Sequence, residues 1–413
     1  MNLLITNIRQ LVNVRETSTL LRGAELAQLP VMEDAWLLIR DGRIQEYGKM
    51  ATLANREFGE GEDLYDARGA SILPAWCDSH THIVFAASRE EEFVDKIRGL
   101  SYAEIAAKGG GILHSARKLN DTPEDILFDQ AWERLQSLMR LGTGAIEIKS
   151  GYGLSVAGEL KMLRVIKRLK EKAPIPVKAS FLGAHTFPLA YREDHEGYIR
   201  LIIDEMIPAI AAEGLADYID VFCEQGFFSP EETERICRAG MAIGLKPRIH
   251  ANQLHVSGGT EMGVKLGAVS VDHLETMDEH AMNTLAASNT IGTLLPTAAF
   301  FLRMPFQPAR TLIEKGCAIA LASDYNPGSS PSGNMNLVVS MSCIQLKLLP
   351  EEAINAATIN GAFAMELGQE LGSITPGKRA NLILTHPIPS LAYLPYAFGS
   401  NLIDKVMING SFI

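Results

Sequence analysis

The chain has 413 residues, of which 47% are hydrophobic and 21% are charged, and its formal net charge is −11. This composition is typical of a globular protein with a large core, and an acidic chain without a basic run is a poor partner for nucleic acid. Its apolar segments are shorter than the ~18 residues of a membrane-spanning helix, so no membrane partner is expected.

The cysteines and the first residues indicate the cellular compartment. The five cysteines are odd in number and form no CxxC pair, so neither a disulfide framework nor a zinc knuckle is indicated. The opening residues, MNLLITNIRQ, lack a basic region and are interrupted by Arg9, which makes them a poor signal peptide. We therefore expect a reduced, soluble, cytoplasmic protein.

Short strands are predicted at both ends of the chain. Residues 3–8, 36–40 and 43–47 are apolar segments separated by turn signals. Residues 380–385 and 405–408 repeat this pattern near the C-terminus. We expect residues 1–66 and 374–413 to form one small composite β domain, a β-sandwich.

Residues 67–373 alternate between strand-like and helix-like segments. Thr122 and Ser229 each precede a proline and acidic residues, a pattern typical of helix starts. Eight such units with buried strands predict an α/β fold, a closed parallel (β/α)8 barrel of the TIM type. The expected strands cover residues 71–82, 144–152, 177–187, 218–225, 246–254, 269–275, 290–296 and 318–326.

Histidines gather at the ends of the expected strands, where the active site of such a barrel lies. His80 and His82 end the first strand, and because alternate strand residues share a face, both imidazoles point the same way. Polar residues also end other strands. His185 ends the third strand, and His250 followed by Gln253 ends the fifth. His273 ends the sixth strand and Asp324 ends the eighth.

This set suits one divalent metal ion, with four expected ligands: His80, His82, His250 and Asp324. Three neutral imidazoles and a carboxylate fit zinc or iron(II), and a bound water would have its pKa lowered toward ~7. His273, Asp324 and His185 would then transfer protons or polarise a carbonyl. A lone His-x-His or strand-end aspartate is commonly structural, but four such coincidences at converging strand ends are not expected.

The motifs resemble the amidohydrolase superfamily of metal-dependent hydrolases. Its members have His-x-His after the first barrel strand, histidines after the fifth and sixth, and aspartate after the eighth. Endings similar to PGKRANLIL, residues 376–384, are common in its flanking β domain. At the end of the fourth strand this chain has Cys223-Glu-Gln225 in place of a lysine, which favours a one-metal site over the carbamylated lysine of two-metal members.

Within the superfamily, nearly the whole chain is similar to the imidazolonepropionase family. The most specific motifs are DSHTH at 78–82, EIKSGYGL at 147–154 and SDYNPGSSP at 323–331. The resemblance implies a histidine-degrading enzyme that hydrolyses 4-imidazolone-5-propanoate to N-formimidoyl-L-glutamate. A metal-bound hydroxide would attack the carbonyl of the cyclic amide, and the family further suggests a homodimer.

The substrate would carry a propionate tail, which requires a cation. Arg89 offers a planar, bidentate contact to a carboxylate, although it could instead form a surface ion pair with Glu90 or Glu91. Gln253 stands where some family members have glutamate, and because an amide cannot shuttle a proton, that role is assigned to His273 and Asp324. By the family pattern, substrate or product also contacts Tyr102, Tyr152, His185, Gln253, Asn326, Gly328 and Ser329.

Two alternatives stay open. Another one-metal amidohydrolase, such as a deaminase of a cyclic base, would use the same ligands but would leave Arg89 without a carboxylate to bind. A metal-free relative that uses the barrel as a scaffold should have lost ligands, whereas all four are present here.

Overall fold

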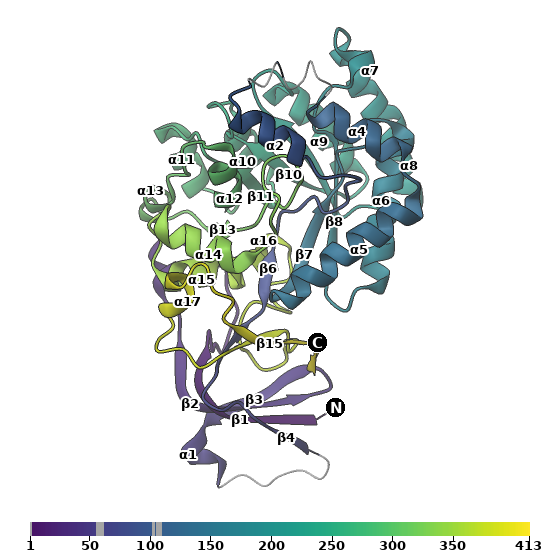
Figure 1. Cartoon of the computed structure of the whole chain (residues 1–413). Coiled ribbons are helices and arrows are strands. Elements are labelled where there is room, and N and C mark those ends of the chain that lie inside the picture. Colours follow the sequence, from purple (N-terminus) through teal and green to yellow (C-terminus); the bar gives the residue numbers. More distant parts are fainter. Residues whose placement is uncertain (1, 55–61, 101–103, 105–109) are drawn as a thin grey trace.

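The computed structural model describes residues 2–54, 62–100, 104 and 110–413. In Figure 1, a sheet built from both ends of the chain lies below a larger α/β barrel, and both termini belong to the lower part. Within the described residues, no helix combines the length and apolar character needed to cross a bilayer.

The lower sheet joins eight strands. β1 and β2 pair antiparallel, and β14 brings in the C-terminal part of the chain by pairing with β5. One face buries an apolar cluster that includes Ile5, Leu37 and Leu382. The predicted union of the two chain ends in a β-rich part is therefore confirmed. Its strands are β1 (Asn2–Val12), β2 (Val31–Arg40), β3 (Arg43–Lys49), β4 (Glu62–Asp66), β5 (Ser71–Pro74), β14 (Leu382–Thr385), β15 (Ile403–Ile408) and β16 (Ser411–Phe412).

The barrel sheet has eight strands in sequence order, and its neighbouring strands are parallel, as predicted. Its ends meet through two main-chain bonds: Asp324 donates to the His80 carbonyl at 3.0 Å, and His82 donates to the Tyr325 carbonyl at 2.9 Å. The strands are β6 (Trp76–Asp78), β7 (Thr143–Lys149), β8 (Val177–Ala184), β9 (Tyr218–Cys223), β10 (Lys246–Ala251), β11 (Ser270–His273), β12 (Ile291–Leu294) and β13 (Ile319–Leu321).

The predicted strand over residues 71–82 is two strands. β5 pairs with β1 and β14 in the lower sheet, whereas β6 pairs with β7 in the barrel. The prediction of a single strand was wrong because an unbroken apolar run does not show where a chain passes from one sheet to another. The lower sheet therefore extends past residue 66.

Helices follow the barrel strands and surround them (Figure 1). The predicted start at Ser229 is confirmed, since its hydroxyl accepts from the Glu232 amide and the Glu232 carboxylate accepts from the Ser229 amide. The prediction that Thr122 caps a helix was wrong, because its hydroxyl donates to the Lys118 carbonyl at the end of the preceding helix. The helices between β6 and β9 are α2 (Glu90–Ile97), α4 (Ile112–Asp121), α5 (Glu124–Arg140), α6 (Val156–Lys172), α7 (His195–Arg200), the π-helix Leu201–Met206 and α8 (Ile207–Glu213). Those from β9 onward are α9 (Pro230–Ala242), α10 (Gly259–Leu266), α11 (Glu279–Ala286), α12 (Pro296–Leu302), α13 (Ala309–Glu314), α14 (Met335–Ile344), α15 (Pro350–Ala357), α16 (Ile359–Ala364) and α17 (Tyr393–Tyr396).

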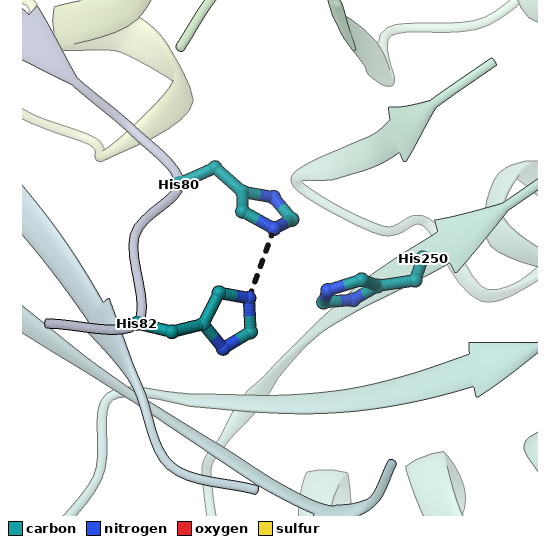
Figure 2. A group of neighbouring side chains, drawn as sticks. All are labelled: His80, His82 and His250. Carbon is teal, nitrogen blue, oxygen red and sulfur yellow. Dashed lines mark hydrogen bonds between the residues drawn. The ribbon is translucent and has the colours of Figure 1, made fainter. Parts of the chain in front are cut away.

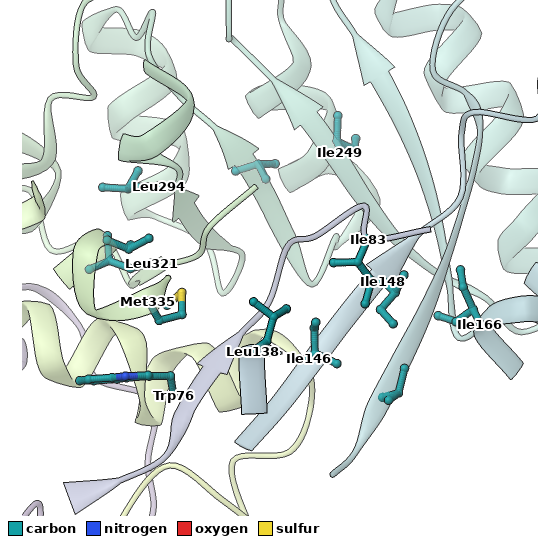
Figure 3. Close-up of a cluster of buried hydrophobic side chains, with 14 of the residues drawn as sticks. Trp76, Ile83, Leu138, Ile146, Ile148, Ile166, Ile249, Leu294, Leu321 and Met335 are labelled. Carbon is teal, nitrogen blue, oxygen red and sulfur yellow. The ribbon is translucent and has the colours of Figure 1, made fainter. Parts of the chain in front are cut away.

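Side chains alternate along the barrel strands. Ile148 and Ile249 belong to the apolar core that packs the strands against the helices, part of which is drawn in Figure 3. Glu147 and Lys149, which flank Ile148, and Arg248, which precedes Ile249, are charged and fully buried. Successive strand residues face opposite sides, so these charged groups point into the barrel. This alternation places a polar layer inside the barrel, below the strand ends.

Candidate metal and substrate site

Three imidazoles converge where the barrel strands end. Figure 2 shows His80, His82 and His250 with their rings turned toward one another. The Nε2 atoms of His80 and His82 are 3.3 Å apart, and one donor atom from each of the three rings lies within 4.8 Å of the others. Each residue is at most 2% exposed. Buried nitrogen donors at this spacing are typical of a transition-metal site.

Asp324 lies beside these imidazoles. Its Oδ1 atom is 3.5 Å from the Nε2 atoms of both His80 and His82. Its φ of 52° is in the left-handed region, where a residue with a side chain is held only by its surroundings. The Asn326 side chain contributes to that hold by donating to the Asp324 carbonyl at 2.7 Å. The structure therefore brings together all four ligands expected from the sequence.

Buried carboxylates orient two of the imidazoles. The Nδ1 atom of His80 is 2.7 Å from Asp272, and that of His250 is 3.1 Å from Asp220. With the Nδ1 proton assigned to these contacts, each Nε2 atom keeps its lone pair, an arrangement typical of metal-binding histidines. The His250 Nε2 atom has no hydrogen-bond partner in the described part of the chain.

The spacing of the donors fits a shared ion. Two nitrogens that each lie ~2.0–2.1 Å from one zinc ion at a tetrahedral angle are separated by roughly 3.3 Å. Burial also lowers the pKa of His80 and His82 well below the ordinary histidine value, because the protein interior solvates a charged imidazolium poorly. These rings are therefore neutral at neutral pH, the form that binds a metal.

A buried charged layer lies beneath the imidazoles. Lys149 Nζ is 2.9 Å from Glu147 and 2.7 Å from Asp220, and Arg248 Nη2 is 3.5 Å from Asp272. These two cations face three carboxylates, and Asp324 adds a fourth, which leaves two negative charges when all are ionised. A divalent cation would balance that excess.

This charged layer was not predicted from the sequence. The signal was present, because charged residues occupy alternate positions in strands that are otherwise apolar. Such residues are costly to bury unless they are paired, so their presence in a core strand indicates an internal ion-pair network.

His273 lies next to the expected ligands. Donor atoms of His80, His273 and Asp324 lie within 4.8 Å of one another. The His273 Nδ1 atom is 3.5 Å from Glu275, which also accepts a hydrogen bond from Gln307 at 2.9 Å. Burial alone would lower the pKa of His273, but Glu275 and the other nearby carboxylates raise it. Burial raises the pKa of Asp324 to about 6, above the ordinary value of an aspartate.

His185 and Tyr152 lie on the other side of His82. The His185 ring stacks on His82 with centroids 5.6 Å apart, and the Tyr152 ring is 5.9 Å from His82. The His185 Nδ1 atom is 3.0 Å from the Gly151 carbonyl, to which we assign its proton. Burial and the neighbouring His250 lower the pKa of His185 to about 3. His185 is therefore neutral with Nε2 as an acceptor, whereas polarising a carbonyl, the role predicted for it, requires a donor.

The turn that carries Tyr152 is fixed by a buried carboxylate. Glu159, near the start of α6, accepts hydrogen bonds from the amides of Gly151, Gly153 and Leu154 at 3.0, 2.7 and 2.9 Å. The EIKSGYGL motif thus supplies both Tyr152 and the backbone donors that hold its turn.

The loop after β13 is stabilised by its own side chains. Asn326 Oδ1 accepts from the amides of Gly328 and Ser329, both at 2.8 Å, and its Nδ2 donates to Asp324 and to Ser329. The side-chain amide of Asn326, which was expected to bind substrate, is therefore used in hydrogen bonds that shape the loop. Ser329 Oγ reaches the Asp324 carboxylate at 3.2 Å, and Gln253 is 9% exposed on the loop after β10.

Arg89 immediately precedes α2. Its Nε and Nη2 atoms donate to Glu92 at 3.0 and 2.5 Å, so the alternative partners suggested from the sequence, Glu90 and Glu91, were wrong by one or two residues. Its Nη1 atom lies against Gly328, where an added Cβ would be only 2.3 Å away. Arg89 thus reaches the loop after β13, while Tyr102 lies outside the described residues.

Comparison with known proteins places this chain in a family. The amidohydrolase family model matches residues 229–413. The imidazolonepropionase of Flavobacterium johnsoniae is 56% identical over 411 residues, covering 99% of both chains. That of Christiangramia forsetii is 52% identical over 414 residues, covering 100% of both.

Solved structures with the same fold are more distant. Escherichia coli guanine deaminase matches 100% of this chain and 99% of its own, with a TM-score of 0.76 and 15% identity. An adenosine deaminase from Xanthomonas campestris with bound zinc matches 99% of this chain and 92% of its own, with a TM-score of 0.70 and 17% identity. At such identities the likeness concerns the fold alone.

Proposed function

This chain belongs to the imidazolonepropionase family of amidohydrolases, and from that membership we infer how its residues catalyse the family reaction. The reaction hydrolyses 4-imidazolone-5-propanoate to N-formimidoyl-L-glutamate, a step in the degradation of histidine. Water adds to the ring carbonyl carbon, the adjacent ring C–N bond breaks, and the released nitrogen takes up a proton. The substrate tail remains as a carboxylate throughout.

We propose that the family's metal is one zinc or iron(II) ion held by His80, His82, His250 and Asp324. The grouping of His80, His82 and His250, with the Asp324 carboxylate 3.5 Å from the first two, is the observation that carries the proposal. A divalent ion bound there would act as a Lewis acid and make hydroxide available near neutral pH. Asp272 and Asp220 keep the Nε2 atoms of His80 and His250 aimed at this point.

Proton transfer is assigned to Asp324 and His273. Asp324 is placed to accept a proton from the attacking water, since its carboxylate lies at the meeting point of the imidazoles and its pKa is raised to about 6. His273, whose pKa is raised in turn, is placed to deliver a proton to the departing ring nitrogen. Glu275 orients His273 through its Nδ1 atom.

The substrate ring and tail are assigned to separate groups. His185 Nε2 would accept a hydrogen bond from a ring N–H, and Tyr152 would contact the ring beside it. Arg89 would bind the tail next to Gly328. Gln253 and Ser329 remain proposed substrate contacts at the mouth of the barrel. Tyr102 remains a proposed substrate contact that rests on the family pattern alone.

A substrate panel tests this function against the deaminase alternative. We expect purified protein to convert 4-imidazolone-5-propanoate to formimidoylglutamate and to release no ammonia from guanine or adenine. Ammonia release from a base, without turnover of the imidazolone, would replace the proposed function with deamination.

We further propose a cytoplasmic homodimer. The five cysteines are unpaired and four of them are buried, which agrees with a reducing compartment. The dimer follows from the family, and sedimentation of the purified protein tests it.

A further inference from the structure

Arg89 just before α2, with Glu92 and Lys96 inside it, brings two cations and one carboxylate beside the loop after β13. We call Arg89, Glu92 and Lys96 the tail cluster, since Arg89 is the residue proposed to bind the substrate tail. The three residues are spaced by three and four positions, so their side chains lie on one face of the helix. Each is partly buried, whereas the neighbouring Glu90 and Glu91 are exposed.

The charge of Arg89 is already compensated within this cluster. Glu92 binds the guanidinium through both carboxylate oxygens, and its Oε1 atom also accepts from the Gly111 amide at 2.9 Å. This pairing fixes the guanidinium by its Nε and Nη2 edge and leaves Nη1 against Gly328. The pair as a whole is neutral, so it offers geometry to a carboxylate but little net charge.

Lys96 supplies the charge that the pair lacks. Its Nζ atom is 3.5 Å from the Gly328 carbonyl and 5.9 Å from the centre of the Phe301 ring on α12. An ammonium has three N–H donors, and within the described residues only the long contact to Gly328 uses one. Lys96 and Arg89 therefore contact the same glycine, and the cluster carries one net positive charge.

We propose that Lys96 is a further substrate-binding residue, which supplies the uncompensated positive charge for the carboxylate tail beside Gly328. This inference rests on the proposed function, because it takes the tail of the imidazolone substrate as the ligand. In this arrangement Glu92 positions Arg89, Arg89 orients the carboxylate, and Lys96 attracts it. One net charge in the cluster matches one charge on the tail.

Lys96→Met tests the proposal through the division between KM and kcat. We expect KM for 4-imidazolone-5-propanoate to rise on the order of tenfold with kcat little changed, since the tail lies away from the bond that breaks. Lys96→Arg keeps the charge and should retain most of the affinity. Lys118→Met is the matched control, because this exposed lysine on α4 borders the same cavity as Arg89 but has no contact with the tail cluster.

A second variant separates charge from structure. Glu92→Gln combined with Lys96→Met restores one net positive charge, so we expect it to recover part of the KM lost in Lys96→Met. A purely structural role for Lys96 would give no such recovery. Melting temperatures of all variants identify any that are misfolded, and Lys96→Gln, which keeps a donor, replaces Lys96→Met if that variant does not fold.

Binding of 3-(imidazol-4-yl)propanoate keeps the test independent of turnover. This probe has the same tail without the reactive carbonyl, and calorimetry should give a Kd for Lys96→Met weakened to the same degree as KM. If the wild type binds the probe through Lys96 but does not hydrolyse the imidazolone, the proposed function fails while the carboxylate-binding role of Lys96 stands. If KM and Kd of Lys96→Met equal those of Lys118→Met, the inference is overturned.

Discussion

The pKa values of His273 and Asp324 are both raised, and His273 lies beside the proposed ligands His80 and Asp324. This proximity leaves two roles to distinguish, since a histidine in that position could bind the metal or transfer a proton. The hydrogen bond between His273 Nδ1 and Glu275 is compatible with both. A substitution that separates metal content from turnover decides between them.

His273→Asn should keep about one metal per chain and lower kcat by ~10²–10⁴-fold, the usual contribution of general acid–base catalysis. Metal content by atomic absorption and turnover are measured on the same preparation. His280→Asn, on the exposed side of α11, is the control. Loss of the metal from His273→Asn would instead make this residue a ligand.

Gly328 is the residue at which Arg89 meets the loop after β13. Gly328→Ala should displace the guanidinium, because its Cβ would lie 2.3 Å from Nη1. We expect KM for the substrate to rise several-fold while metal content stays unchanged. Gly399→Ala has open space at its Cβ and should leave KM unaltered. An unchanged KM in Gly328→Ala would mean that the guanidinium adjusts freely and that its position is not critical.

The residues at strand ends were predictable, and those fixed by loop geometry were not. His80, His82, His250 and Asp324 could be found because parallel strands end at one side of a barrel. The partner of Arg89 and the hydrogen bonds of Asn326 depend on how loops fold back, and no periodic pattern encodes this.

At the scale of elements, the capping box of α9 is an interaction that is local in sequence. Ser229→Ala removes the acceptor of the Glu232 amide and should lower the free energy of unfolding by about 1 kcal/mol. Ser229→Asp keeps an acceptor and should be close to wild type, and denaturant unfolding compares the two. Equal losses in both variants would mean that contacts other than the cap govern this position.

At the same scale, the two predicted helix starts differ in how the chain caps them. Ser229 and Thr122 both precede Pro and acidic residues, but the Thr122 hydroxyl bonds back to Lys118 and ends the helix before it. Thr122 therefore ends α4, and α5 begins at Glu124, one residue later than a cap at Thr122 predicts. Likewise, β5 and β6 were predicted as one strand because both are buried and their residues form one apolar run.

At the scale of the whole molecule, the buried charges inside the barrel do not balance. In the ion-pair layer together with Asp324, two buried cations face four carboxylates, so two negative charges remain when all are ionised. Chelation should therefore lower the melting temperature, since an ion present at ~1,000 times its Kd stabilises the folded state by about 4 kcal/mol. Calorimetry with and without chelator, followed by added zinc, measures the effect.

His250→Ala serves as the control for that experiment, because it removes one proposed ligand and should make the melting temperature insensitive to chelator. An identical melting temperature for the wild type with and without chelator would contradict the charge argument. It would mean that the carboxylates are neutralised by protons rather than by an ion.

The architecture of the whole chain could be predicted from the sequence better than its individual contacts. Eight alternating units imply a barrel, and strand-rich ends imply a separate β-rich part, because both follow from periodicity along the chain. The ion-pair layer inside the barrel was not foreseen, since its partners come from four strands far apart in sequence.

The central claim is that one metal-loaded site hydrolyses the imidazolone ring. The most direct test is a titration of metal-free protein with zinc or iron(II), following formimidoylglutamate formation and bound metal together. Turnover should rise with metal and reach its plateau at about one ion per chain, because these ligands can form a single metal site. Full metal occupancy without turnover of 4-imidazolone-5-propanoate, or turnover that is complete before any metal is added, would contradict it.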